Sequence, residues 1–145
     1  MQNIIFKIIK NFPPEVAHYI TIKLLKYSFK KNVYLNDTML HQHILGFDFS
    51  NPIGMAAGFD KNVEVVNSLL KLGFGFVEAG TITPKKQLGN AKPRIFRLTE
   101  DLAIINHLGF NNKGSEFAEK QLKKLNLNPL SEGIVGINIG KNKYS

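Results

Sequence analysis

Three short apolar segments, at residues 53–59, 74–79 and 133–139, most limit how this chain can fold. Between them, apolar residues recur every three or four positions over 65–72 and again over 115–125, which is typical of amphipathic helices. Strands that alternate with helices through short connections predict a parallel sheet, because two parallel strands need a crossover between them. The expected fold class is therefore α/β.

Turn residues and local patterns set the expected boundaries of the elements. The first helix of the sheet region is expected to open at Asp60-Lys61-Asn62 and to end at Gly73, since glycine commonly terminates helices. Its predicted apolar face consists of Val65, Val66, Leu69, Leu70 and Leu72. Apolar and polar residues alternate over 45–55 and predict a hairpin around Asn51-Pro52. Two further short strands are expected at residues 94–98 and 103–106.

Glycine and polar residues gather where the three apolar segments end. The clusters are Ala57-Gly58-Phe59-Asp60-Lys61, Gly80-Thr81 and Asn138-Ile139-Gly140-Lys141-Asn142. In α/β sheets and barrels the carboxyl ends of the strands form the edge at which ligands bind. None of the clusters has the G-x-G-x-x-G or P-loop spacing, so no motif supports a dinucleotide site or an NTPase.

The first 31 residues form a basic and apolar arm. They hold six lysines and one glutamate and so carry +5 of the net charge of +8. Apolar residues over 4–12 form one helical stripe, and prolines then break the chain before a second helix, expected from Pro14 to about Lys30. Two interpretations stay open, which are a helical hairpin packed on the body and an amphipathic pair lying in a bilayer interface. The arm has no arginine, which disfavours nucleic-acid binding.

Composition excludes several classes of site. The chain has no cysteine, so it can form neither a disulfide framework, nor a cysteine-ligated zinc site, nor a thiolate nucleophile. No apolar run approaches the roughly 18 residues that a membrane-spanning helix needs. His41 and His43 have alternating spacing, but with no carboxylate or third histidine expected nearby they predict no metal site.

Five segments together resemble the dihydroorotate dehydrogenase family, in the family's order and at close to its spacing. They are 51–61 (NPIGMAAGFDK), 73–84 (GFGFVEAGTITP), 89–98 (GNAKPRIFRL), 105–112 (INHLGFNN) and 136–142 (GINIGKN). The two-helix arm is similar to that of the quinone-dependent, membrane-associated class, called class 2. The resemblance implies the N-terminal part of a (β/α)8 TIM barrel, with the arm at 1–38 and the first strands and helices of an FMN-binding barrel at 39–145.

The resemblance also implies an activity, which is oxidation of (S)-dihydroorotate to orotate through FMN, with a quinone as the electron acceptor, in pyrimidine biosynthesis. The serine base and the phosphate-binding loops of the family are expected beyond Ser145, so the chain is expected to be an inactive N-terminal fragment. A peripheral location is expected, on the cytoplasmic side of a bacterial inner membrane or on the mitochondrial inner membrane. Two alternatives remain, a soluble FMN-dependent dihydroorotate or dihydropyrimidine dehydrogenase and a non-catalytic membrane-binding module.

Site residues follow from the same matched segments. The expected FMN-binding residues are Ala57, Gly58, Phe59, Asp60, Lys61, Thr81 and Asn138. The expected substrate-binding residues are Lys61, Asn106, His107, Leu108, Gly109 and Phe110, with Asn111 as a further candidate. His18 and Arg97 are expected to border the quinone channel, and no metal ligand is expected. Because none of the flavin or substrate residues lies in the arm, removing 1–38 is expected to spare flavin reduction and to slow reoxidation by quinone.

Overall fold

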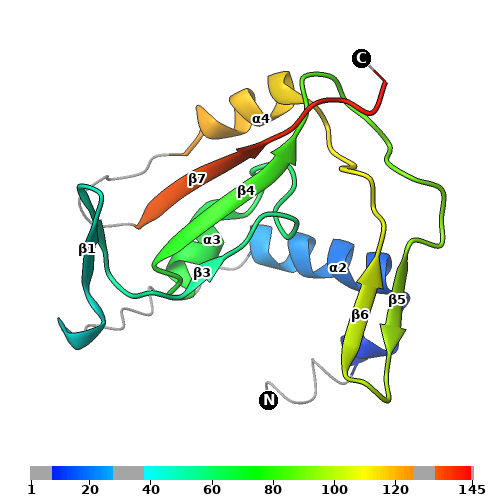
Figure 1. Ribbon diagram of the computed structural model, residues 1–145, viewed down its shortest axis with the longest axis horizontal. Coiled ribbons are helices and arrows are strands. Elements are labelled where there is room, and N and C mark those ends of the chain that lie inside the picture. The colour runs from blue at the N-terminus through cyan, green and yellow to red at the C-terminus, as the bar shows by residue number, and fades with distance from the viewer. Residues whose placement is uncertain (1–7, 28–37, 126–132, 145) are drawn as a thin grey trace.

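The structure, a computed structural model, describes residues 8–27, 38–125 and 133–144. Its centre is a parallel sheet in the order β3-β4-β7. The strands are β3 (Gly54–Met55), β4 (Phe76–Ile82) and β7 (Ile134–Ile139), with β4 between the other two (Figure 1). The parallel sheet expected from the sequence is therefore confirmed, and the fold is α/β.

Helices cover one face of this sheet. α3 (Val66–Lys71) connects β3 to β4, and α4 (Ser115–Leu122) precedes β7. Val77 and Ala79 of β4 are fully buried in one cluster with Leu69 of α3 and Ala118 of α4. This cluster forms the hydrophobic core of the described residues.

The opposite face of the sheet is only partly covered. Side chains alternate along a strand, so Phe76 and Glu78 point away from the helices. An antiparallel hairpin of β1 (Gln42–Ile44) and β2 (Phe47–Phe49) lies beside this face. The Phe49 ring meets Phe76 edge-on at 5.6 Å, and a groove of about 520 Å³ separates the hairpin from the strands.

The helix of the arm, α2 (Pro14–Lys26), packs on the same core as α3. Ile22 and Leu25 contact the core, and the Ser68 hydroxyl donates a hydrogen bond to the Leu25 carbonyl at 2.7 Å. The outward row of α2 remains exposed and comprises Val16, Tyr19, Leu24 and Tyr27. One apolar side of α2 therefore packs on the body, and another side is exposed.

A second antiparallel hairpin, β5 (Ile95–Leu98) and β6 (Ala103–Asn106), lies beside α2 in Figure 1. Arg97 donates hydrogen bonds at 2.8 Å to the carbonyls of Lys10 and Phe12, where the first helix of the arm ends. Of that predicted helix, residues 8–10 are helical and residues 4–7 lie outside the described part.

Several predicted boundaries are wrong for identifiable local reasons. The first hairpin turns at Leu45-Gly46, not at Asn51-Pro52, and both turn residues have positive φ values of 52° and 83°. β3 is two residues long, not seven, and α3 begins at Val66. The Asp60 carboxylate accepts backbone hydrogen bonds from Glu64 at 2.8 Å and Val65 at 2.7 Å, and this closes a compact loop ahead of the helix.

Other boundaries shift by a few residues. α2 ends at Lys26 and α4 at Leu122, each earlier than expected. Leu72 is 38% exposed and lies outside the core, and residues 134–138 of β7 are half-buried. Gly73, with φ of 102°, ends α3 as predicted.

The core predicts a clear difference between two leucines near the same helix. Leu69→Ala should lower the free energy of unfolding by about 2–5 kcal/mol, because Leu69 is 1% exposed and its removal leaves a cavity. Leu72→Ala, at a 38% exposed position, should cost less than about 1 kcal/mol. Urea unfolding followed by circular dichroism measures both values, and equal losses would show that the core is placed incorrectly.

Candidate functional site

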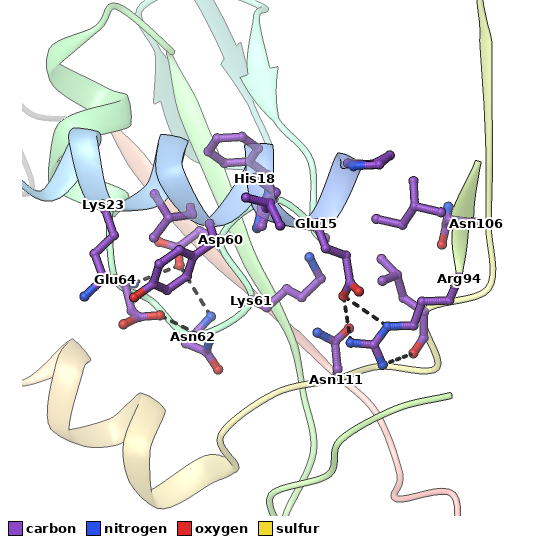
Figure 2. Close-up of a pocket in the computed structure, with 18 of the residues that line it drawn as sticks. Glu15, His18, Lys23, Asp60, Lys61, Asn62, Glu64, Arg94, Asn106 and Asn111 are labelled. Atoms are coloured by element: carbon purple, nitrogen blue, oxygen red, sulfur yellow. Dashed lines mark hydrogen bonds and ion pairs between the residues drawn. The ribbon is translucent and has the colours of Figure 1, made fainter. Parts of the chain in front are cut away.

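A cavity of about 860 Å³ lies between α2, the loop of residues 58–64 and the β5–β6 hairpin, and we call it the α2 pocket. It brings together many of the predicted site residues, which are His18, Gly58, Phe59, Asp60, Lys61, Arg97, Asn106, Leu108 and Asn111. Figure 2 shows α2 along one side of the pocket and Lys61 reaching in from the loop. Ala57, Thr81, His107, Gly109, Phe110 and Asn138 do not line it.

Lys61 extends from the loop that follows β3 and is half-buried. Burial lowers the pKa of Lys61 from its ordinary value of 10.5; the charges of Glu15 and Asp60 oppose this shift, and the charge of Arg94 adds to it. The expected opening of a helix at this residue is wrong, because α3 begins five residues later. Lys61 is therefore an ammonium group in a confined space, where a neighbouring anion is favoured.

His18 reaches the same pocket from α2. Its ring meets Phe59 edge-on, with the ring centres 5.3 Å apart. The pKa of His18 is lowered to about 4, mainly by burial and also by the charge of Lys61, while the charge of Glu15 opposes the shift. The imidazole is therefore neutral at pH 7 and can both donate and accept a hydrogen bond.

A buried ion pair joins α2 to the other side of the pocket. Arg94 is 6% exposed and donates to Glu15 Oε1 through Nε at 3.0 Å and Nη2 at 2.7 Å. Burial alone would raise the pKa of Glu15, but hydrogen bonds and charges from Arg94 and Lys92 outweigh it and lower the pKa. Glu15 and Arg94 were absent from the predicted site, since they lie 79 residues apart and no local pattern links them.

The same arginine holds the segment predicted to bind substrate. Arg94 Nη1 donates to the carbonyls of Leu88 at 2.7 Å and Asn90 at 2.8 Å. Asn90 in turn donates to the carbonyls of His107, at 2.7 Å from its side chain, and Leu108, at 3.0 Å from its backbone. The backbone of this segment is therefore fixed by the loop that Arg94 organises.

Individual residues of the segment face different ways. Asn106 and Leu108 line the α2 pocket, whereas the His107 ring stacks on Phe96 and Phe110 is exposed. Among the described residues, the Asn111 amide oxygen is one of two buried side-chain polar atoms without a hydrogen-bond partner. Asn111 also lines the pocket, so this oxygen is an acceptor that a bound molecule could satisfy.

The predicted flavin residues lie together at the ends of β3, β4 and β7. Gly58 donates its N–H to the Gly80 carbonyl at 2.8 Å, which brings residues 57–61 beside the end of β4. Thr81 donates to Asn138 at 2.7 Å, and the Asn138 amide donates to Glu78 at 2.9 Å. A side chain at Gly58, where φ is 105°, would meet no atom within 4 Å. The uncovered backbone at Gly58, beside the hydrogen-bonded side chains of Thr81, Asn138 and Glu78, could accept a flat ring with a polar edge, such as that of FMN.

Asp60 shapes this region by holding the loop of residues 60–65 in place. It is 1% exposed, its carboxylate binds loop N–H groups, and its carbonyl accepts from Gly80 at 2.9 Å. The carboxylate is thus committed to the loop, and the part of Asp60 left to contact a ring is its backbone.

A histidine–carboxylate contact lies far from this site. His43 Nδ1 is 2.6 Å from Asp48 Oδ1, so the expectation that no carboxylate lies near the histidines is wrong. Within residues 8–27, 38–125 and 133–144, no group of three or more histidine, cysteine or acidic side chains could hold a metal ion. In the same ranges no helix is both long and apolar enough to cross a bilayer.

If the Glu15–Arg94 ion pair holds α2 on the body, its loss should lower stability. Arg94→Met should lower the free energy of unfolding by about 3 kcal/mol, because it leaves Glu15 and several carbonyls without their donor. Lys92→Met removes a second cation from Glu15, at 3.2 Å, but Lys92 is 69% exposed, so the loss should stay below about 1 kcal/mol. Urea unfolding gives the two values, and hydrogen exchange should show faster exchange in α2 for Arg94→Met alone.

The acid dependence follows from the lowered pKa of Glu15. A carboxyl group whose pKa is lower in the folded state stabilises that state above its unfolded pKa, and this contribution is lost as the pH falls through the folded pKa. The stability difference between the original protein and Arg94→Met should therefore be full at pH 7 and shrink below pH 4.5. If the difference in the free energy of unfolding between the two proteins were the same at pH 3 as at pH 7, the Glu15–Arg94 ion pair would not be its cause.

Comparison with known proteins adds the family. The family model described as dihydroorotate dehydrogenase matches residues 39–145. A dihydroorotate dehydrogenase (quinone) from Rhizobium rhizogenes is 54% identical over 133 residues, which cover 91% of this chain and 36% of the relative. A mitochondrial dihydroorotate dehydrogenase (quinone) from Cyclocybe aegerita is 52% identical over 132 residues, covering 91% of this chain and 39% of the relative.

Solved structures agree with these relatives. DHODH from Eimeria tenella in complex with ferulenol matches with a TM-score of 0.84 and 45% identity, over 98% of this chain and 40% of that one. The ligand-free form from the same organism matches with a TM-score of 0.80 and 46% identity, over 91% of this chain and 38% of that one. The chain thus spans well under half the length of these relatives, and it belongs to the dihydroorotate dehydrogenase family.

Proposed function

We propose that this chain forms the N-terminal portion of a quinone-dependent enzyme that oxidises dihydroorotate to orotate with FMN as its cofactor. The observation that carries the proposal is the α2 pocket, in which Lys61 from a strand end lies with Asn106 of the substrate segment and His18 of the arm. The names of the relatives, which are dihydroorotate dehydrogenases (quinone), support the same activity.

The residues at the strand ends would hold the cofactor ring. Ala57, Gly58 and Phe59 would lie against the ring, and the polar chain of Thr81 and Asn138 would meet its polar edge. When bound, FMN would supply the hydride acceptor, which no amino-acid side chain can provide. The described residues supply position and charge around that acceptor.

Lys61, Asn106 and Asn111 would bind the substrate. Dihydroorotate carries a carboxylate, and a half-buried ammonium group such as that of Lys61 attracts an anion more strongly than the same group in water. The Asn106 amide and the unpartnered oxygen of Asn111 would pair with the amide groups of the pyrimidine ring. Lys61 would also offset negative charge that builds up on the cofactor during hydride transfer.

The arm would provide the quinone site and the contact with the bilayer. His18 is neutral, Arg97 lies nearby in the lining of the same pocket, and both would bind the polar head of a quinone. The exposed row of α2 carries apolar side chains, and Lys10 and Lys23 are exposed beside it. Such a surface favours a peripheral position on an anionic membrane, on the cytoplasmic side of a bacterial inner membrane or on the mitochondrial inner membrane.

The sheet would be the beginning of a (β/α)8 barrel. Its three parallel strands have helices on one face and a partly open second face, as the first strands of a barrel would have. In this proposal residues 1–38 form the quinone-binding arm, and residues 39–145 form the first part of the barrel.

The proposal is tested on the longer protein that carries this chain at its N-terminus. The purified protein should show a flavin absorbance spectrum that bleaches when dihydroorotate is added without oxygen, and a ubiquinone analogue should restore the colour. Fumarate should not restore it. Bound flavin that fumarate reoxidises, while the quinone analogue does not, would favour a soluble type of enzyme.

Two substitutions separate the roles of Lys61 and Asn106. Lys61→Ala should slow flavin reduction at saturating dihydroorotate by about 10²-fold or more, because the charge it supplies acts during hydride transfer. Asn106→Ala should raise the KM for dihydroorotate about tenfold and leave FMN bound, because only a substrate hydrogen bond is lost. Anaerobic stopped-flow absorbance measures both effects. Near-normal rates in Lys61→Ala, or loss of flavin from Asn106→Ala, would contradict these assignments.

The outward row of α2 predicts how the protein binds membranes. Leu24→Glu, at a position that is 57% exposed, should reduce binding to vesicles of phosphatidylglycerol and phosphatidylcholine about tenfold or more, since burying a leucine contributes about 1.5–3 kcal/mol. The control Leu45→Glu changes an equally apolar residue on the β1–β2 turn and should leave vesicle flotation unchanged. Equal losses in the two variants would show that α2 is not the membrane surface.

A further inference from the structure

Glu15 is a residue of the arm that lines the proposed dihydroorotate site. It lies in the first turn of α2, yet its carboxylate points across the α2 pocket toward Arg94 (Figure 2). The same figure shows the Lys61 side chain beside it, and both residues line the pocket. One carboxylate from the arm thus faces two cations of the body, Lys61 and Arg94.

Arg94 links Glu15 to residues 106–111, the segment predicted to bind substrate, through closely packed contacts. Beyond its bonds to Leu88 and Asn90, Arg94 Nη1 lies 3.4 Å from the Leu108 carbonyl. A methyl group added at Gly89 would come within 2.2 Å of that carbonyl and 2.7 Å of Arg94 Nη1. A displacement of the guanidinium group would therefore move the backbone of Leu108 and of Asn106, two residues earlier.

We propose that Glu15 is a positioning residue for dihydroorotate oxidation, because its carboxylate faces Lys61 across the α2 pocket and holds Arg94 against the segment of residues 106–111. This inference rests on the proposed function, and it makes the arm part of the site at which substrate reduces the cofactor. The expectation from the sequence that residues 1–38 can be removed without loss of flavin reduction is revised accordingly. Their removal takes Glu15 away and should slow that half-reaction as well.

The charges around Lys61 determine the direction in which its pKa moves when Glu15 is neutralised. The groups facing it are Glu15 and His18 from α2, Asp60 from its own loop and Arg94 from the segment before β5. The carboxylate of Asp60 is bound by loop N–H groups, and His18 is neutral at pH 7. Without the charge of Glu15, burial and Arg94 lower the pKa of Lys61 further, so Lys61 loses its proton at a lower pH.

The test compares Glu15→Gln with Lys26→Gln in the longer protein. Both substitutions remove one charge from α2 and break ion pairs between α2 and the body. Glu15 pairs with Arg94 and Lys92, and Lys26 pairs with Glu64 at 2.5 Å near the other end of the helix. Anaerobic flavin reduction by dihydroorotate is recorded from pH 6 to pH 10. In Glu15→Gln, the alkaline limb of the pH profile of kred/Kd, the reduction rate constant divided by the dissociation constant for dihydroorotate, should move to lower pH. Lys26→Gln should leave this limb in place.

A second measurement does not depend on flavin or on turnover. In protein labelled with ¹³C at the lysine ε-carbon, the Lys61 resonance, assigned with Lys61→Arg, should titrate at a lower pH in Glu15→Gln than in the original protein. If the longer protein neither binds FMN nor oxidises dihydroorotate, the proposed function fails while this titration still tests the role of Glu15. If Glu15→Gln does not fold, Glu15→Asp takes its place, because it moves the carboxylate back by one methylene. Glu15→Asp should shift the pH profile of flavin reduction and the Lys61 titration in the same direction, but by less.

Three results would overturn the inference. These are an alkaline limb that is unchanged in Glu15→Gln, an equal shift in Lys26→Gln, and a Lys61 titration that does not move. A uniform fall in rate with no change in the pH profile would assign Glu15 to packing alone.

Discussion

A buried guanidinium group organises much of this molecule. Arg94 is removed from water, and a cation in that position needs a compensating charge and a partner for each N–H group. The carboxylate comes from the arm, and the remaining acceptors are the carbonyls of Leu88, Asn90 and Leu108. One side chain thereby sets the distance between α2, the β5–β6 hairpin and the loop at 88–90.

Apolar packing and polar contacts together hold α2 on the body. Near its C-terminus, Ile22 and Leu25 pack on the hydrophobic core, beside the hydrogen bond from Ser68 to the Leu25 carbonyl and the Lys26–Glu64 ion pair. Near its N-terminus, Glu15 pairs with Arg94 through two hydrogen bonds that fix angle as well as distance. Apolar packing therefore holds the helix against the body, and the Glu15–Arg94 pair sets the position of its first turn over the pocket.

The sequence predicted the features that repeat within a few residues. The parallel sheet, the β5–β6 strands and the glycine stop at Gly73 all follow from apolar spacing or backbone preference. The loop at 60–65 was mistaken for helix because Asp60 competes for the first amide groups through its side chain. The Glu15–Arg94 pair escaped prediction because tertiary structure brings its two partners together across 79 residues.

The free edge of β7 has a consequence during protein synthesis. Its outer backbone N–H and C=O groups have no strand beside them within the described part of the chain, and its Ile139 is largely exposed. In a protein made from its N-terminus, this edge would emerge from the ribosome before any strand that pairs with it. During that interval the nascent sheet could pair with a neighbouring chain, so slow translation past this point would favour aggregation and chaperone capture.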